Sequence, residues 1–489
     1  MRVGGEYAER GPLVFATAVT VSLALVTAAV LTGRGVLPLV ALIMLAMLVF
    51  VSHRSVTRWQ SLLAAMILVI LFVPIKRYAF PGNLPLDLEP YRLVVALIVA
   101  GWIASMLVDP RVRLRRSGLE GPIFLIAYSS LASVAVNQSL VDETGVHGEV
   151  VKGLAFLVSY FLIVYVVVSA VRSHDEIVNI ERMLVGGGTL VAVGALVEFH
   201  TGFNVFDRIA DAIPLLEASD AVDLTSRGGT SRVFASAQGP IPLGAMLVML
   251  MPFALHLGRA TRQRRWWVAG VLLVLGALAT VSRTSTLMLA VVGLVFLILR
   301  PVETRRMWPA LVPALVVVHA AVPGTIGSLE DAFFPPGGLV KEQSAHPGWG
   351  GSGRIADLGP AMDQFAERPL LGQGFSTRQT GREQRRDQIL DDQWLKNLLE
   401  TGVIGTFAWI WLFGRFIRRT GRAAKDDDSD RGWLLVAVTA SVTAYAMGMV
   451  FFDAFSFVQV TLVLFVVIAL GAASLSIGHR PGLPGAEIR

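Results

Sequence analysis

The sequence predicts an all-α protein that crosses a membrane many times, a polytopic helical bundle with one large extracytoplasmic loop. Of its 489 residues, 54% are hydrophobic and 16% are charged, whereas soluble proteins are about 45–50% apolar and about 25% charged. The apolar residues lie in long blocks separated by short loops that contain arginine. There is no cysteine, which excludes a disulfide framework, a thiolate metal site and a cysteine nucleophile.

Fourteen apolar blocks approach the length of about 20 residues that a helix needs to cross a bilayer. Each block is bounded by glycine, proline or charged residues. The predicted spans are 12–31, 36–51, 59–73, 91–108, 120–136, 152–170, 183–199, 234–258, 266–281, 284–299, 307–322, 395–414, 432–452 and 457–475. The first block has no clear small-x-small cleavage site, so we expect a retained anchor.

The spans and the loops between them divide the chain into three parts. Residues 1–322 hold the first eleven spans and a medium outer loop at about 200–233. Residues 323–393 form the large extracytoplasmic loop, in which apolar residues at helical spacing predict an amphipathic helix that stops before Pro369. Residues 394–489 hold the last three spans and a cytoplasmic tail.

The positive charges predict the orientation of the bundle. If both termini are cytoplasmic, more than half of the 42 lysines and arginines fall in cytoplasmic segments, where Lys and Arg are normally enriched. The inverted topology would reverse this bias. The net charge of +6 therefore indicates orientation in a cytoplasmic membrane and no affinity for nucleic acid.

Three arginines map to the outer side at positions that suit an anionic ligand. Arg232 directly precedes a span, Arg283 lies between two spans with almost no loop, and Arg354 opens the amphipathic part of the large loop. An arginine near hydrocarbon needs a partner, and its fork of five donors matches phosphate or carboxylate. Alternatively, Arg283 extends to the lipid headgroups while the other two form salt bridges in the loops.

Two acidic residues, Asp391 and Asp392, stand directly before the span at 395–414. They can cap the helix, or one of them can act as the general base for an acceptor hydroxyl. The histidines have no metal-ligand spacing, and there is no Gly-Lys-Ser/Thr loop, which argues against a metal site and an ATP-driven pump.

Four segments, in order, resemble the O-antigen ligase and O-antigen polymerase superfamily. They are Arg232-Val-Phe-Ala-Ser-Ala-Gln-Gly-Pro240, Thr280-Val-Ser-Arg283-Thr-Ser, Gly353-Arg354 with Pro369-Leu-Leu-Gly-Gln-Gly374, and Asp391-Asp392-Gln-Trp-Leu-Lys-Asn-Leu-Leu-Glu400-Thr-Gly402-Val-Ile-Gly405. Ligases of this superfamily have His-Asn in place of Asp391-Asp392, and that histidine is their proposed base. The departure favours a polysaccharide polymerase or another glycan transferase of the superfamily.

The resemblance implies a membrane glycosyltransferase with a GT-C-like bundle, active on the outer face of the cytoplasmic membrane. The donor glycan is carried on a polyprenyl diphosphate, which Arg232, Arg283 and Arg354 hold, and the acceptor is a glycan or lipid-linked glycan activated by Asp391 or Asp392. No nucleotide sugar, metal or other cofactor is implied. Other envelope polysaccharide assembly proteins are further expected partners.

The alternative function is a lipid-linked oligosaccharide flippase or another polytopic transporter. Transporters often carry charges or broken helices near the bilayer midplane, in repeated halves. Here Glu198 lies near the outer end of a span and Asp453 lies in a tight turn. A scaffold for envelope assembly is a third possibility that the sequence leaves open.

Overall fold

The computed structural model describes residues 59–79, 89–108, 113–209, 217–218, 226–227, 230–335, 337–338, 340–341, 358–378 and 391–477. Almost all of them belong to one compact unit, Leu63–Arg489. The predicted spans 12–31 and 36–51 lie outside the described residues, and so does Arg354.

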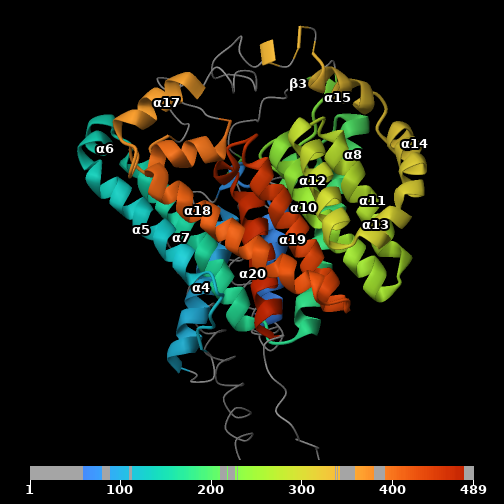
Figure 1. Ribbon diagram of the computed structural model, residues 1–489, viewed down its shortest axis with the longest axis horizontal. Helices are drawn as coiled ribbons and strands as arrows, with labels where there is room; N and C mark the ends of the chain where they lie inside the picture. Colours follow the sequence, from blue (N-terminus) through green and yellow to red (C-terminus); the bar gives the residue numbers. More distant parts are fainter. Residues whose placement is uncertain are drawn as a thin grey trace, which may run out of the picture. The chain divides into compact units, whose positions relative to one another are not determined.

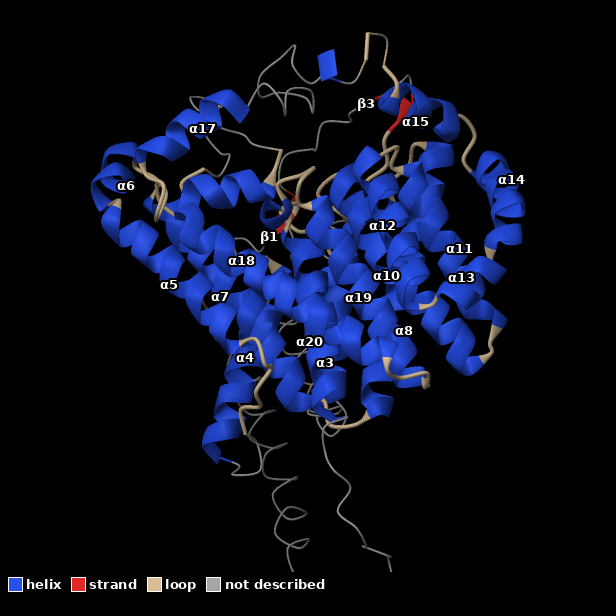
Figure 2. Ribbon diagram, in the orientation of Figure 1, coloured by secondary structure: helices blue, strands red, loops and turns tan. Residues whose placement is uncertain are grey.

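The described residues are predominantly helical, as the sequence predicts (Figures 1 and 2). The helices are α3 (Trp59–Phe72), α4 (Pro90–Val108), α5 (Glu120–Val136), α6 (Gln138–Thr144), α7 (His147–Ala170), α8 (His174–Thr201), α10 (Pro240–Thr261), α11 (Arg264–Ala279), α12 (Arg283–Leu299), α13 (Pro301–Arg306), α14 (Leu311–Ala321), α15 (Thr325–Phe333), α17 (Leu358–Glu367), α18 (Gln393–Lys425), α19 (Asp430–Gly448) and α20 (Val458–Ile477). Short 3-10 turns are η1 (Val205–Arg208), η2 (Trp308–Ala310) and η4 (Ala454–Ser456).

Strands are few and short in the described part of the chain. β1 (Tyr78–Ala79) pairs with β2 (Glu217–Ala218), and β3 (Ser226–Arg227) pairs with β4 (Thr230–Ser231), both antiparallel. They join loops and form no layer of their own.

Every predicted span from 59–73 onward coincides with a helix. By length and composition, five of the described helices can cross a membrane: α4, α7, α8, α10 and α20. The number rises to seven if two bent pairs, α5 with α6 and α14 with α15, each count as one span. The protein is therefore a multi-pass membrane protein, while the total of about 14 spans stays a prediction.

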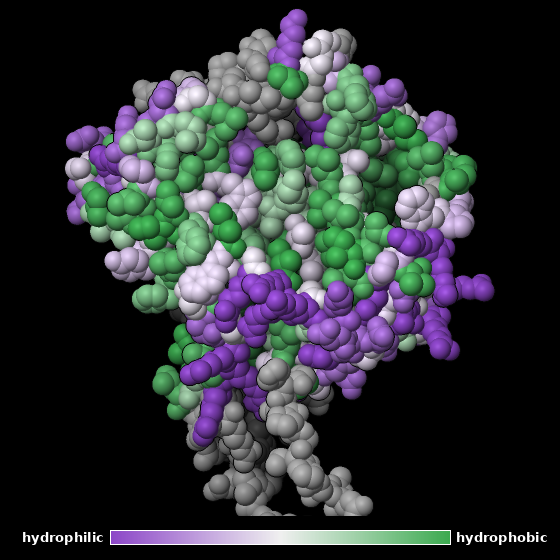
Figure 3. Space-filling model, viewed as in Figure 1, coloured by the Kyte–Doolittle hydropathy of each residue, from purple (hydrophilic) through white to green (hydrophobic). Residues whose placement is uncertain are grey.

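Burial separates the central helices from the lipid-facing ones. The apolar windows of α10 and α20 are 83% buried, whereas that of α4 is 22% buried. A helix that is apolar on all sides belongs in the interior of a bundle, as α20 does. Exposed apolar side chains on α4, such as Leu97 and Leu107, suit contact with hydrocarbon. Figure 3 shows the resulting apolar band across the visible face of the helical unit.

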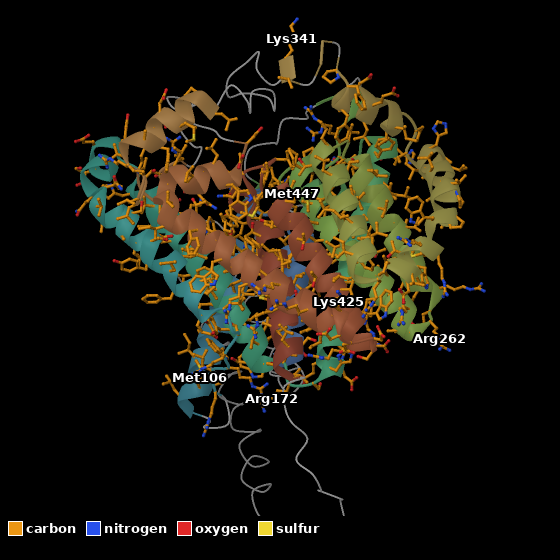
Figure 4. All side chains as sticks on the ribbon, viewed as in Figure 1. Met106, Arg172, Arg262, Lys341, Lys425 and Met447 are labelled. Carbon is orange, nitrogen blue, oxygen red and sulfur yellow. The ribbon has the colours of Figure 1, made fainter. Side chains whose placement is uncertain are left out.

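The two ends of the helical unit differ in charge. Arg172, Arg262 and Lys425 lie at one end, here called the basic end, and Lys341 lies at the opposite end (Figure 4). That opposite end holds the chain between successive helices at 73–79, 202–209, 232–239, 280–282 and 449–457, and we call it the loop end.

Candidate functional site

Three helix ends meet at the loop end: the start of α12, the start of α18 and the end of α19. The backbone N–H of Gln393 donates to the carbonyl of Met449 at 2.8 Å. On α19, a Cβ added to Gly448 would lie 2.8 Å from the sulfur of a methionine in α12, so these two helices are in close contact. Because Arg283 begins α12 and Asp391 precedes α18, the structure brings both to the same end of the bundle.

The adjacent aspartates have different surroundings. Asp392 caps α18, because its Oδ1 accepts the backbone N–H groups of Trp394 at 2.8 Å and Leu395 at 3.0 Å. A carboxylate also suits the positive end of the helix dipole. Asp391 is half-buried and lies one residue before the cap. Of the two predicted candidates for a general base, Asp391 is therefore the one that does not cap the helix.

Arg232 reaches the turn between α11 and α12, and Arg283 directly follows that turn in the chain. Nε of Arg232 donates to the carbonyl of Thr280 at 3.2 Å, and Nη1 of Arg283 donates to the carbonyl of Ala332, at the end of α15, at 2.9 Å. The turn is tight, since Val281 has a left-handed backbone with φ of 49°. The short connection holds Arg283 at the first residue of α12, and the two predicted arginines thus share one turn.

The segment that follows Arg232 is held by two buried charged side chains. Glu198, near the end of α8, accepts the backbone N–H of Ala235 at 2.8 Å. Arg77 donates to the carbonyl of Ala235 at 3.1 Å and forms an ion pair with Asp207 at 2.9 Å. Charge-assisted hydrogen bonds of this kind are stronger than neutral ones, so the backbone beside Arg232 has a defined position.

Helix α18 is bent at Gly402, whose φ of 63° and ψ of −164° are not helical. The predicted span 395–414 includes this residue, and the bend within it was not predicted. Residues 369–378 dock into the bend: the N–H of Val403 donates to the carbonyl of Pro369 at 2.9 Å. A Cβ on Gly402 would lie 2.3 Å from the carbonyl oxygen of Leu370, so the close approach requires glycine.

The loop segment before this bend also packs on α18. Helix α17 ends at Glu367, before Pro369, where the sequence predicted the stop. Ala361 of α17 forms a small apolar cluster with Leu395 and Leu399 of α18, and α17 lies beside the first part of α18 in Figure 1. Two motifs that are separate in the sequence are therefore one packed unit.

One buried ion pair at the start of α18 was not predicted. Nζ of Lys396 donates to Asp453 Oδ2 at 2.8 Å and to Ser456 Oγ at 3.2 Å, and Lys396 is buried. Oε1 of Gln393 accepts the N–H of Phe455 at 2.7 Å. The sequence feature that could have revealed this ion pair is a lysine inside a predicted span, since a charge in that position needs a partner.

A comparison with known protein families finds a match in the region that contains most of these residues. Residues 268–410 match the sequence model of the O-antigen ligase family. The match runs from α11 into α18 and includes Arg283, the large loop, Asp391 and Asp392, whereas Arg232 lies before it. It contains three of the four motifs and confirms the resemblance to the O-antigen ligase superfamily. No curated protein sequence matches the chain.

Proposed function

We propose that the chain, whose residues 268–410 match the O-antigen ligase family, is a membrane glycosyltransferase that moves a glycan from a polyprenyl diphosphate to an acceptor hydroxyl. The acceptor is a glycan or a lipid-linked glycan, and the product is a cell-surface polysaccharide of the O-antigen type. The aspartates in place of the His-Asn of ligases favour a polymerase over a lipid A-core ligase.

One observation carries this proposal: the contacts of α12, α18 and α19 bring two arginines and a carboxylate other than the helix cap to the same end of a membrane bundle. Arg232 donates to the turn that precedes Arg283, and Asp391 precedes the helix that is bound to the end of α19. A glycan transfer from a diphosphate needs these two kinds of group together, cations for the leaving group and a base for the acceptor.

In the proposed reaction, the bond between the anomeric carbon and the diphosphate oxygen breaks as the acceptor oxygen bonds to that carbon. Negative charge grows on the departing diphosphate, and Arg232, Arg283 and Arg354 stabilise it. The carboxylate of Asp391 takes the proton of the attacking hydroxyl, while Asp392 remains the helix cap. Confinement of both glycans at one membrane surface lowers the barrier through proximity. The reaction uses no nucleotide sugar and no metal.

The charge distribution supports an extracytoplasmic site within a GT-C-like bundle. Arg172, Arg262 and Lys425 lie at the basic end (Figure 4), and positive residues favour the cytoplasmic side of a membrane. With that end in the cytoplasm together with both termini, the loop end faces outward.

The test uses the full-length protein in liposomes with lipid-linked oligosaccharide. We expect Arg283→Ala to abolish lengthening of the glycan and Arg283→Lys to restore only part of it, because lysine lacks the planar fork of donors. The matched control Arg262→Ala, at the basic end, keeps full activity. Unchanged polymer from Arg283→Ala would remove the main support for the proposal.

Asp391 is tested separately. Loss of a general base slows a reaction by roughly 10²–10⁴-fold, so Asp391→Asn should lower the rate by about that factor while the protein still inserts into membranes. Full activity of this variant would leave Asp391 without a catalytic role. If the wild type instead moves unchanged substrate across the bilayer, the protein is a flippase.

A further inference from the structure

A second part of the loop end has surroundings that suit a lipid. An apolar groove of about 250 Å³ lies on α4, α7 and α20, and Val95, Val99, Leu162 and Leu462 are among its lining residues. Since only 22% of the apolar window of α4 is buried, one wall of the groove belongs to a helix that contacts the bilayer. Hydrocarbon can therefore enter the groove directly from the membrane.

Two cations line the groove at its end nearest the loop end. Helices α4 and α7 both start at the loop end and run toward the basic end, so Arg92 and Lys152 lie within their first two turns. The guanidinium carbon of Arg92 lies 5.3 Å from the centre of the Phe156 ring. The groove thus combines an apolar channel with a positively charged mouth.

The charges around this mouth are not balanced. Glu89 pairs with Arg92 at 3.0 Å and accepts the backbone N–H of Lys76 at 2.7 Å, and Lys152 also acts on this carboxylate. Burial and the nearby charge of Lys152 lower the pKa of Lys76 below its usual range. Asp453 and Lys396 also act on Lys76. Among the described residues, four cations therefore surround two carboxylates, and a bound phosphate group would neutralise the excess of positive charge.

The groove adjoins the start of α18. Phe156 and Tyr160 line both the groove and a small cavity of about 30 Å³. Gln393 and Lys396 of α18 also line that cavity, and Asp391 lies just before them in the chain. A headgroup at the mouth would therefore lie on the side of α18 that leads to the proposed base.

The groove is separate from the turn at 280–282, here called the arginine turn, which Arg232 contacts and Arg283 follows. Helix α7 packs on α20, α20 packs on α19, and α19 packs on α12. Two helices thus lie between the groove wall on α7 and the helix that begins with Arg283.

We propose that the groove on α4, α7 and α20 binds the hydrocarbon chain of a second lipid-linked substrate, with its phosphate group at Arg92 and Lys152. This inference rests on the proposed transferase function. A polymerase joins two lipid-linked glycans, and the turn that holds Arg232 and Arg283 takes the diphosphate of only one of them. The second lipid then presents its glycan to Asp391 from the side of α18 and α20 that faces away from the arginine turn.

The experiment uses the full-length protein in nanodiscs of phosphatidylcholine and a polyprenyl diphosphate with a photoreactive diazirine on its chain. We expect the diazirine to label peptides of α4 and α7. Ala96→Trp fills the groove and should lower this labelling by about tenfold, the effect of losing roughly 1.4 kcal/mol of binding energy. Leu97→Trp is the matched control, since Leu97 is exposed on the same helix and is not part of the groove lining.

The headgroup is tested in the same assay. Loss of a hydrogen bond to a charged group costs about 1.5–3 kcal/mol, so Lys152→Gln should also lower the labelling by at least about tenfold. Arg283→Ala should leave labelling of α4 and α7 unchanged, because the two sites are separate. If Arg283→Ala abolishes that labelling as well, one lipid occupies one site and the inference is wrong.

Two other occupants of the groove would also overturn the inference. Equal competition by phosphatidylglycerol would identify a site for any anionic lipid. Crosslinks from a photoreactive residue at position 96 to residues 1–58 would identify another part of this chain. Glycan lengthening by a protein whose groove takes no label would refute this inference alone, whereas a wild type without lengthening would refute the proposed function.

Discussion

The bend of α18 at Gly402 predicts how much stability the protein loses when this glycine is replaced. The change is Gly402→Ala, with Gly414→Ala as the matched control in the same helix. Gly402 has φ of 63° and ψ of −164°, and an added Cβ would lie 2.3 Å from the backbone oxygen of Leu370. Gly414 lies in regular helix, and an added Cβ there has nothing within 4 Å.

The destabilisation has two sources. A residue other than glycine in this region of backbone conformation costs about 1–3 kcal/mol. The Cβ also pushes residues 369–378 away from the bend, which breaks the hydrogen bond from Val403 to Pro369 and costs about 1 kcal/mol more. We therefore expect Gly402→Ala to lose about 2–4 kcal/mol, whereas Gly414→Ala is neutral or gains up to about 1 kcal/mol, because alanine favours the helix.

The assay is thermal unfolding of the purified protein in detergent, combined with amide hydrogen exchange. A chain of this length has an unfolding entropy of roughly 1 kcal/mol per degree, so the apparent melting temperature of Gly402→Ala should fall by about 3 °C. Exchange should rise in residues 369–378 and in the first part of α18. Equal melting temperatures for the two variants, with unchanged exchange in 369–378, would refute this account of the bend.

Three further predictions concern named pairs and caps. Lys396→Met leaves Asp453 buried without its cation and should lower the free energy of unfolding by about 3–5 kcal/mol, and Asp453→Leu in the same chain should restore much of it, as thermal unfolding will show. Asp392→Ala should lose about 1 kcal/mol of cap energy while Asp392→Asn loses little, and a large activity loss in Asp392→Asn would give this residue a role beyond capping. Burial pushes the pKa of Asp427 upward, but its hydrogen bonds at the start of α19 and the charge of Arg431 outweigh this and hold the pKa below its usual range. The resulting stability is present above the unfolded-state pKa of about 4 and is lost as the pH falls through the folded-state pKa. Arg431→Met should therefore raise the pKa of Asp427 in an NMR titration.

The helices could be predicted because the length of an apolar block is a local property of the chain. Positions next to very short connections could be predicted too: Arg283 has to begin α12, since the preceding turn allows no other place for it. For Arg232, the sequence predicted only that it shares the outer side with Arg283, and the hydrogen bond to Thr280, 48 residues away, was not predicted. For the helices and for Arg283, the information lies within a few residues of the position concerned.

Contacts between distant segments could not be predicted in the same way. Lys396 and Asp453 are 57 residues apart, and neither residue type at its position identifies the other. The bend at Gly402 was missed because the hydropathy of 395–414 is continuous through it, and the cause of the bend lies in the docked residues 369–378. The separate roles of Asp391 and Asp392 depend on which carboxylate reaches the first N–H groups of α18, which is a matter of backbone geometry.

These missed contacts all converge on the first part of α18, which suggests how the proposed site is kept in register. Its cap Asp392 precedes this part, Lys396 joins it to η4, and the bend at Gly402 joins it to the large loop. The arginine turn belongs to α12, so the distance from Asp391 to the diphosphate depends on how α18 is held against α19. Misplacement of a catalytic group by about 1 Å can lower a rate by about 10²-fold. Gly402→Ala should therefore reduce glycan transfer far more than its stability loss alone explains, even at temperatures where the variant remains folded.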